Sequence, residues 1–170
     1  DMSMDGLCLY ASVLDMRREL TGGKIDRIQQ PEKDELLLSI RSASQNYKLL
    51  INVSAADNRV HITDERKQSP TDAPMFCMLL RKRITAGRIL GFEQTNTDRV
   101  LSIGIETYNE LGDLAEFTLN CELMGKHSNI ILVGDNGTVI DAIKHVGLGM
   151  SSVRPMMPGV QYSLPPAQDK

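Results

Sequence analysis

Short stretches in which apolar and polar residues alternate recur along this chain, and they constrain its fold more than any other feature. Leu36, Leu38 and Ile40, for example, alternate with Leu37, Ser39 and Arg41, and Leu49, Ile51 and Val53 alternate with Leu50, Asn52 and Ser54. A period of two is typical of a strand that buries one face and exposes the other. The sequence predicts strands over residues 24–29, 36–41, 49–54, 60–62, 89–93, 100–107, 114–123, 129–133 and 139–144.

Helical patterns are fewer than strand patterns. Apolar residues recur at helical spacing over Leu9–Leu20. Gly22 and Gly23 follow this stretch and are expected to end the helix. A second helix is expected to begin near Pro74, with Thr71 or Asp72 as its cap. The Asp-Asn-Gly sequence at 135–137 predicts a hairpin turn. Many short strands and two helices predict an α+β domain, mainly an antiparallel β-sandwich or open barrel flanked by the helices.

The domain is expected to occupy residues 1–153. Residues 154–170 include four prolines and have no periodic pattern. We interpret them as an extended segment that leaves the domain toward modules further along a longer protein.

Composition restricts the class of function. The net charge is −3, whereas proteins that bind nucleic acid through a broad electrostatic surface are usually basic. Aromatic residues make up 4% of the chain and tryptophan is absent, which argues against a platform for stacking bases. Any contact with nucleic acid is therefore expected to be local.

The cysteine pattern indicates a reducing compartment, and we expect the cytoplasm. Cys8, Cys77 and Cys121 are odd in number and far apart, so we interpret them as buried free thiols. The chain shows neither a secretory signal nor an apolar run of the ~20 residues that span a bilayer. The spacing of cysteines and histidines fits no metal site, and no set of nucleophile and base is recognisable. We therefore expect a binding module without metal or cofactor, not an enzyme.

The short bend between the strands at 114–123 and 129–133 is unusually polar. Lys126 and His127 can meet an anion, while Ser128 and Asn129 can donate to phosphate or read a base. Gly125 allows a close approach of the backbone. A polar hairpin loop without a ligand is the simpler alternative. The residues alone leave both alternatives open.

Three further residues belong to the same hypothesis. Glu122 is expected at the base of the bend, where it either orients Lys126 or His127 or is solvated. Asp98 and Arg99 precede a strand, and the planar guanidinium suits phosphate or base edges while the carboxylate orients it. A solvated pair at the start of a strand is the alternative. One shared RNA site requires the two motifs to lie close together and not on opposite faces.

A second group of cations lies at the end of the helix after Pro74. These side chains either form a solvated helix end or contact phosphates. They are Arg81, Lys82, Arg83 and Arg88.

Several of these motifs occur together in one known family. In chain order the pieces are MDG near the start, RVHIT at 59–63, PMFCMLLRK at 74–82, DR at 98–99, ELMGKHSNIIL at 122–132, and RPMMPG and YSLPPAQ beginning at 154 and 162. With these pieces the chain resembles the N-terminal domain of the NFACT family. This family comprises bacterial RqcH proteins and their eukaryotic relatives in ribosome-associated quality control.

The resemblance implies a function. Family members bind a large ribosomal subunit that is obstructed by peptidyl-tRNA. They recruit tRNA, alanyl-tRNA in bacteria, so that alanines extend the stalled chain without a template. The resemblance implies tRNA contacts by Asp98, Arg99, Glu122, Met124, Gly125, Lys126, His127, Ser128 and Asn129.

The resemblance also raises two alternatives. Bacterial members carry the older label fibronectin-binding protein A, which implies a surface adhesin, but the sequence shows neither an anchor nor disulfides in support. The family domain is similar in fold to the N-terminal domain of formamidopyrimidine-DNA glycosylases. Those enzymes use an N-terminal proline amine, whereas Ser3, Met4 and Asp5 follow Met2 here. Neither glycosylase chemistry nor DNA binding is therefore expected.

Overall fold

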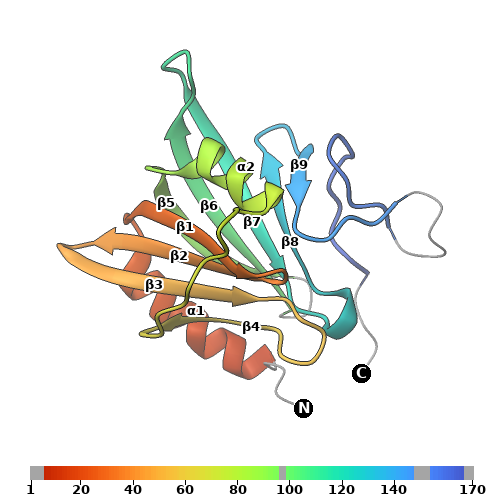
Figure 1. The fold of residues 1–170 in the computed structure, drawn as a ribbon, viewed down its shortest axis with the longest axis horizontal. Coiled ribbons are helices and arrows are strands. Elements are labelled where there is room, and N and C mark those ends of the chain that lie inside the picture. The colour runs from red at the N-terminus through yellow and green to blue at the C-terminus, as the bar shows by residue number, and fades with distance from the viewer. Residues whose placement is uncertain (1–5, 96–98, 148–153, 167–170) are drawn as a thin grey trace.

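The computed structural model describes residues 6–95, 99–147 and 154–166. Within these residues, nine strands form one antiparallel sheet in the order β4-β3-β2-β1-β5-β6-β7-β8-β9 (Figure 1). Their bounds are β1 Lys24–Glu32, β2 Glu35–Ser42, β3 Gln45–Asn52, β4 Arg59–Thr63, β5 Arg88–Thr95, β6 Val100–Tyr108, β7 Leu114–Glu122, β8 Asn129–Gly134 and β9 Val139–Ala142. Strands β1–β4 and β5–β9 are therefore two meanders that run outward from the centre of the sheet.

The two meanders are joined over a short length. Strands β1 and β5 pair at Lys24 and Arg88, with further backbone hydrogen bonds that link Gly23 to Ile89 and Ile25 to Gly87. Helix α2, Met75–Ile84, contacts β1 of the first meander and β6 of the second.

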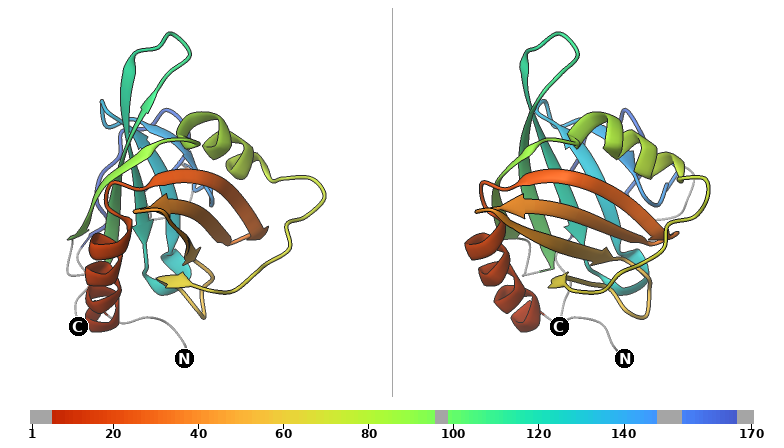
Figure 2. Two further views of the ribbon diagram at one scale, coloured as in Figure 1. Left: turned by 90° about the vertical axis from the view of Figure 1, so that its left-hand side faces the viewer. Right: turned by 60° about the vertical axis from the view of Figure 1, so that its left-hand side comes forward.

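One hydrophobic core lies inside the folded-over sheet and takes residues from both meanders. Helix α1, Gly6–Leu20, packs against β2, β4 and β5 (Figure 2). It buries one face, formed by Leu9, Val13, Met16 and Leu20. Helix α2 buries Phe76, Cys77, Leu80 and Ile84. Both helices form because apolar residues at helical spacing can be buried together here.

The predicted α+β fold, an antiparallel sheet with two helices, is confirmed, and the strands form one open sheet. The hairpin turn at 135–137 is also confirmed, because Gly137 has a φ of 82° and its N–H donates to the Gly134 carbonyl at 3.0 Å. The likeness to formamidopyrimidine-DNA glycosylases stays a prediction.

Two local predictions are wrong. The N-cap of α2 is Pro74 with no capping hydrogen bond from a side chain, so neither Thr71 nor Asp72 caps the helix. Cys8 is exposed, because it lies away from the buried face of α1, whereas Cys77 and Cys121 are buried free thiols as expected.

The described part of the C-terminal segment, residues 154–166, packs against the sheet. Val139 donates its N–H to the Val160 carbonyl at 2.8 Å, and Tyr162 donates to the Gly137 carbonyl at 2.8 Å. Met156 joins a second apolar cluster over β8 and β9. The predicted boundary at 153 lies outside the described residues, and the division into a domain and an exit segment stays a prediction.

Among the residues that the structure describes, no helix is long and apolar enough to cross a membrane. The same residues contain no group of three or more His, Cys, Asp or Glu side chains that could hold a metal ion.

Candidate nucleic-acid interface

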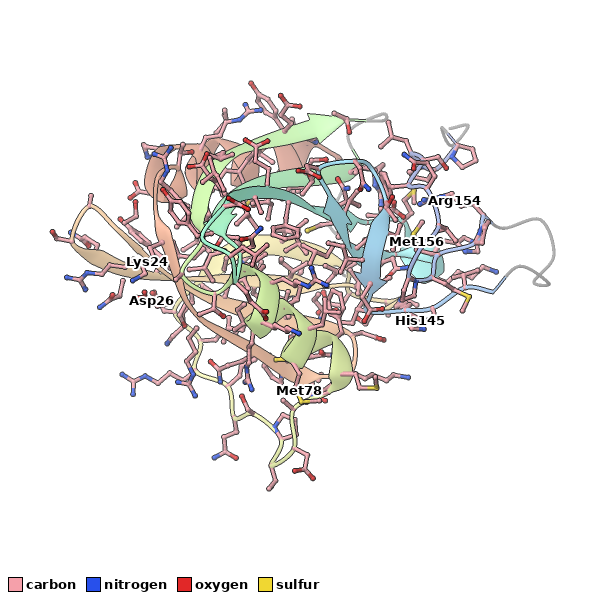
Figure 3. The ribbon with its side chains drawn as sticks, turned by 90° about the horizontal axis from the view of Figure 1, so that it is seen from above. Lys24, Asp26, Met78, His145, Arg154 and Met156 are labelled. Carbon is pink, nitrogen blue, oxygen red and sulfur yellow. The ribbon has the colours of Figure 1, made fainter. Side chains whose placement is uncertain are left out.

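A hollow of about 870 Å³ lies at the end of β7, between the polar bend and the C-terminal segment. Its walls combine basic side chains with apolar ones. The basic lining is Lys126, His127, Lys144 and Arg154, and the apolar lining includes Met124, Val146, Met156, Leu164 and Pro165. Figure 3 shows His145, Arg154 and Met156 together on this side of the molecule, with Lys24 on the opposite side.

The bend itself is a short 3-10 turn, Gly125–His127, here called the η1 bend together with Ser128 and Asn129. Gly125 has a φ of 57°, a conformation that glycine adopts without strain. The buried Ser128 hydroxyl accepts the Met124 N–H at 2.8 Å and donates to the Gly125 carbonyl at 2.7 Å. Ser128 therefore holds the bend closed.

Replacing Ser128 with alanine should lower the free energy of unfolding by about 1–2 kcal/mol, because the buried Met124 N–H would lose its acceptor. Urea unfolding measures this loss. Ser163→Ala is the matched control, since this serine lines the same hollow and its side chain is exposed. Equal stability of the two variants would contradict the structural role of Ser128.

Asn129 is also occupied within the fold. Its amide donates to the Lys144 carbonyl at 2.9 Å and its Oδ1 accepts the Lys144 N–H at 3.0 Å. These bonds fix the chain after β9 beside the start of β8. Lys144 in turn donates its ammonium to the Val53 carbonyl at 2.6 Å, and burial lowers the pKa of this ammonium.

Lys126 and His127 are the exposed side chains of the η1 bend. They project from a turn that hydrogen bonds hold in place, so an anion could bind them without first ordering the chain. Within the bend, contact with a ligand therefore falls to these two residues.

Arg99 lies directly beside the bend. Its Nε donates to the Leu123 carbonyl at 2.8 Å, and its own carbonyl accepts the Leu123 N–H at 2.9 Å. The next residue, Val100, pairs with Glu122. The predicted proximity of the two motifs is confirmed for Arg99, which is half-buried next to the hollow. Asp98 lies outside the described residues.

Glu122 is almost completely buried, with 1% of its surface exposed. Its Oε1 pairs with Arg154, and its Oε2 accepts the Tyr162 hydroxyl at 2.6 Å. Burial and the neighbouring Glu122 charge raise the pKa of Tyr162. The expectation that Glu122 orients Lys126 or His127, or is solvated, is therefore wrong: it anchors the C-terminal segment.

Arg154 completes this anchor. Besides Glu122, it donates Nη1 to the Ser163 carbonyl at 2.6 Å, and its guanidinium lies 5.6 Å from the centre of the Tyr162 ring. The three side chains, here called the Glu122 anchor (Glu122, Arg154 and Tyr162), hold one wall of the hollow in place.

The second group of cations, three on α2 and Arg88 on β5, is not brought to this site. Arg81 donates Nε to the Ile28 carbonyl at 2.9 Å, and Arg88 pairs with Glu106 at 3.7 Å. Lys82 and Arg83 are exposed on the last turn of α2. Figures 1 and 2 show α2 and the η1 bend apart in every view.

The order of these motifs along the chain matches one known family. A model of the NFACT N-terminal and middle domains matches residues 5–170. The chain belongs to the NFACT family. A curated NFACT relative, the Rqc2 homolog RqcH of Bacillus subtilis strain 168, is 42% identical over 170 residues. That match covers 99% of this chain and 30% of the relative, so the chain spans less than a third of it.

Two solved structures resemble this NFACT domain closely. The N-terminal domain of fibronectin-binding protein PavA from Streptococcus pneumoniae has a TM-score of 0.92 and 39% identity, covering 95% of this chain and 62% of that one. The N-terminal part of the fibronectin/fibrinogen-binding protein of Streptococcus suis has a TM-score of 0.93 and 39% identity, covering 98% and 62%.

Sequence reasoning missed part of the site in this NFACT chain. Arg154 and Tyr162 were not among its candidates, because residues 154–170 were interpreted as an exit segment. Lys144 was considered only as the end of a predicted strand. One signal was available. A glutamate placed in a strand whose neighbours are apolar needs a cation or donor if it is buried, and Arg154 and Tyr162 meet that need.

Proposed function

We propose that this chain is the tRNA-binding module of a ribosome-associated quality control factor. The observation that carries the proposal is the contact between Arg99 and Leu123, which brings Arg99 beside the η1 bend. The exposed Lys126 and His127 project from that bend next to a hollow with basic walls. A local cluster of cations on a chain of net charge −3 suits a ligand that is met at a few phosphates.

The charged groups around the hollow divide into two kinds. Arg154 is neutralised by the buried Glu122, and Lys144 is bound to the Val53 carbonyl with a lowered pKa. Arg154 and Lys144 therefore form part of the walls of the hollow and are not its free cations. Lys126, His127 and Arg99 are then the groups that meet RNA, while Glu122, Met124, Gly125, Ser128 and Asn129 support them.

The wider activity belongs to a longer protein. We infer that it recruits alanyl-tRNA to large ribosomal subunits obstructed by peptidyl-tRNA, so that stalled chains receive C-terminal alanine tails. The RqcH relative supports this assignment. In this role the chain is a cytoplasmic binding module without cofactor, and it performs no chemistry itself.

Fibronectin binding is the second candidate, and the names of the two solved structures favour it. It predicts binding to fibronectin and exposure of the protein on intact cells. Fractionation of cells distinguishes the two candidates. A quality control factor is expected in the ribosome fraction, whereas a fibronectin-binding protein is expected at the cell surface.

The experiment that tests the proposal is tRNA binding by the Lys126→Ala/His127→Ala variant. We expect about a tenfold loss of affinity at low salt, and a slope of log affinity against log salt that is smaller by about 1. The variant should keep its stability, since both side chains are exposed.

Lys24→Ala is the matched control, because Lys24 is an exposed lysine on the opposite side of the molecule (Figure 3). It should bind tRNA as the wild type does. Equal losses in both variants would mean that binding is diffuse and would contradict a site at the η1 bend. No binding by the wild type would contradict tRNA binding by this chain.

A further inference from the structure

The hairpin between β6 and β7 projects beyond the rest of the sheet. Pairing of β6 with β5 ends at Glu106, opposite Arg88, and pairing of β7 with β8 begins at Phe117, opposite Gly134. Residues 107–116 therefore form a two-stranded ribbon, and no third strand from the described part of the chain pairs with either side. Figures 1 and 2 show this ribbon, here called the finger, standing clear of the body.

Hydrogen bonds close the turn at the tip of the finger. Asn109 Oδ1 accepts the N–H groups of Leu111 and Asp113 at 2.9 and 3.0 Å, and the Asn109 N–H donates to the Asp113 carbonyl at 2.8 Å. Gly112 has a φ of 82°, which closes the turn. An isolated ribbon in water is only marginally stable, so these bonds give the finger a defined shape.

The finger exposes three large apolar side chains. Tyr108 is 73% exposed, Leu111 86% and Leu114 56%. Tyr108 and Leu114 are directly opposite each other in the ladder, so they lie on one face, with Leu111 at the tip. Single exposed apolar residues are normal, but a group of them on a projecting element indicates an interaction surface.

Acidic residues surround this apolar face. Glu106 and Glu116 are directly opposite each other, two positions below Tyr108 and Leu114 on the same face. Like charges that face each other across a ladder destabilise it. Glu110 and Asp113 add two more at the tip, and residues 100–125 contain no lysine, arginine or histidine. Arg88 on β5 pairs with Glu106, so Glu110, Asp113 and Glu116 leave this face with a net negative charge. The face therefore repels RNA and is complementary to a basic surface.

A second hollow, of about 360 Å³, continues the same face at the base of the finger. Leu90, Gly104 and Glu116 line it. It exists because Gly104 has no side chain: a Cβ there would meet only the Cβ of Leu90, at 3.5 Å. An apolar or basic side chain of a partner could enter it beside the Glu116 carboxylate.

We propose that the finger and this hollow are a docking surface for a basic protein of the large ribosomal subunit. The inference rests on the proposed function, which brings this chain to the large ribosomal subunit. Proteins that pack against ribosomal RNA carry basic surfaces, so the subunit offers a partner of the right charge. Leu111, Tyr108 and Leu114 make the apolar contact, and the carboxylates of Glu110, Asp113 and Glu116 select a basic partner. The finger thus contacts ribosomal protein while the η1 bend contacts tRNA.

Binding of the chain to purified large ribosomal subunits tests the inference with Leu111→Lys. This change removes the apolar contact and adds the wrong charge for a basic partner, so we expect about a tenfold weaker affinity. Leu7→Lys is the matched control, because Leu7 is 78% exposed on α1. An added lysine strengthens contact with RNA, so unchanged or tighter binding by Leu111→Lys would overturn the inference.

Gly104→Val is the second variant, and it separates docking from folding. Valine suits a strand, and its Cβ would meet only the Cβ of Leu90 at 3.5 Å, so we expect stability to be equal or higher. The filled hollow should weaken binding to subunits about fivefold. Both variants should bind isolated tRNA as the wild type does. Retained subunit binding by Gly104→Val would exclude the hollow from the surface and overturn that part of the inference.

A photoreactive residue at position 111 identifies what the finger touches on the subunit. Crosslinks to a basic ribosomal protein support the inference, and crosslinks to ribosomal RNA alone overturn it while the proposed function stands. A wild type that binds tRNA but not subunits also overturns it. A wild type that binds neither would overturn the proposed function and this inference together.

Discussion

Glu122→Ala should lower the free energy of unfolding by about 3 kcal/mol. The change leaves the Arg154 guanidinium and the Tyr162 hydroxyl without the carboxylate that both of them contact. Removing one partner of a buried ion pair costs about 3–5 kcal/mol, and the lower end applies because 21% of the Arg154 side chain is exposed. The C-terminal wall of the hollow should then separate from the sheet.

Chemical denaturation measures the loss of stability, and proteolysis of the segment at 154–166 reports its release. Tyr162→Phe removes one of the two contacts to Glu122 and should cost about 1 kcal/mol. Glu93→Ala is the control for an exposed glutamate and should be neutral. If Glu122→Ala were no less stable than Glu93→Ala, the Glu122 anchor would not hold the segment.

Arg99→Ala should weaken tRNA binding by about 1–3 kcal/mol, which is a loss of affinity of about five- to 150-fold. The guanidinium lies beside the η1 bend, so its loss removes charge at the centre of the proposed interface. It also removes the hydrogen bond to the Leu123 carbonyl, which should lower the free energy of unfolding by about 1 kcal/mol. The two effects are separated by measuring affinity and stability on the same sample.

Arg99→Lys refines this prediction, because lysine keeps the charge but lacks the planar fork of donors. It should recover part of the affinity at low salt. Arg41→Ala is the matched control: Arg41 is exposed and donates to Asn46 near the β2–β3 turn, away from the η1 bend (Figure 1). If Arg99→Ala is folded and binds tRNA as tightly as Arg41→Ala does, Arg99 is excluded from the interface.

Much of the fold could be predicted from the sequence because its signals are local. Alternation over 100–107 indicates a strand wherever it pairs, and the Asp-Asn-Gly turn determines how the last two strands connect. The strand at 36–41 was also predicted, although Leu36, Leu37 and Leu38 are all buried there and do not alternate in exposure. The start of α1 at Gly6 and the cap of α2 were less predictable, because tertiary packing determines where a helix ends.

The candidate site was predictable only in part, for a physical reason. The polar residues of the η1 bend were visible, but their roles depend on partners far along the chain. Asn129 binds the backbone of Lys144, and Glu122 binds Arg154 and Tyr162, at separations that no periodicity reveals. Two residues expected to read RNA, Ser128 and Asn129, are thus engaged in holding the bend.

For the finger, the sequence predicted the strands but not their exposure. Its alternating pattern predicted the two strands but not the projection, since the lengths of β5 and β8 determine where their pairing stops. Tyr108, Leu111 and Leu114 are ordinary strand and turn residues in the sequence, and their exposure is a property of the sheet.

The measurement that tests the central claim most directly is a side-by-side titration of this chain with tRNA and with fibronectin, at low and at physiological salt. We predict binding to tRNA that weakens as salt rises, as expected when Lys126 and Arg99 meet phosphates, and no comparable binding to fibronectin. Tight binding to fibronectin with none to tRNA would contradict the assignment of the η1 bend and Arg99 to RNA.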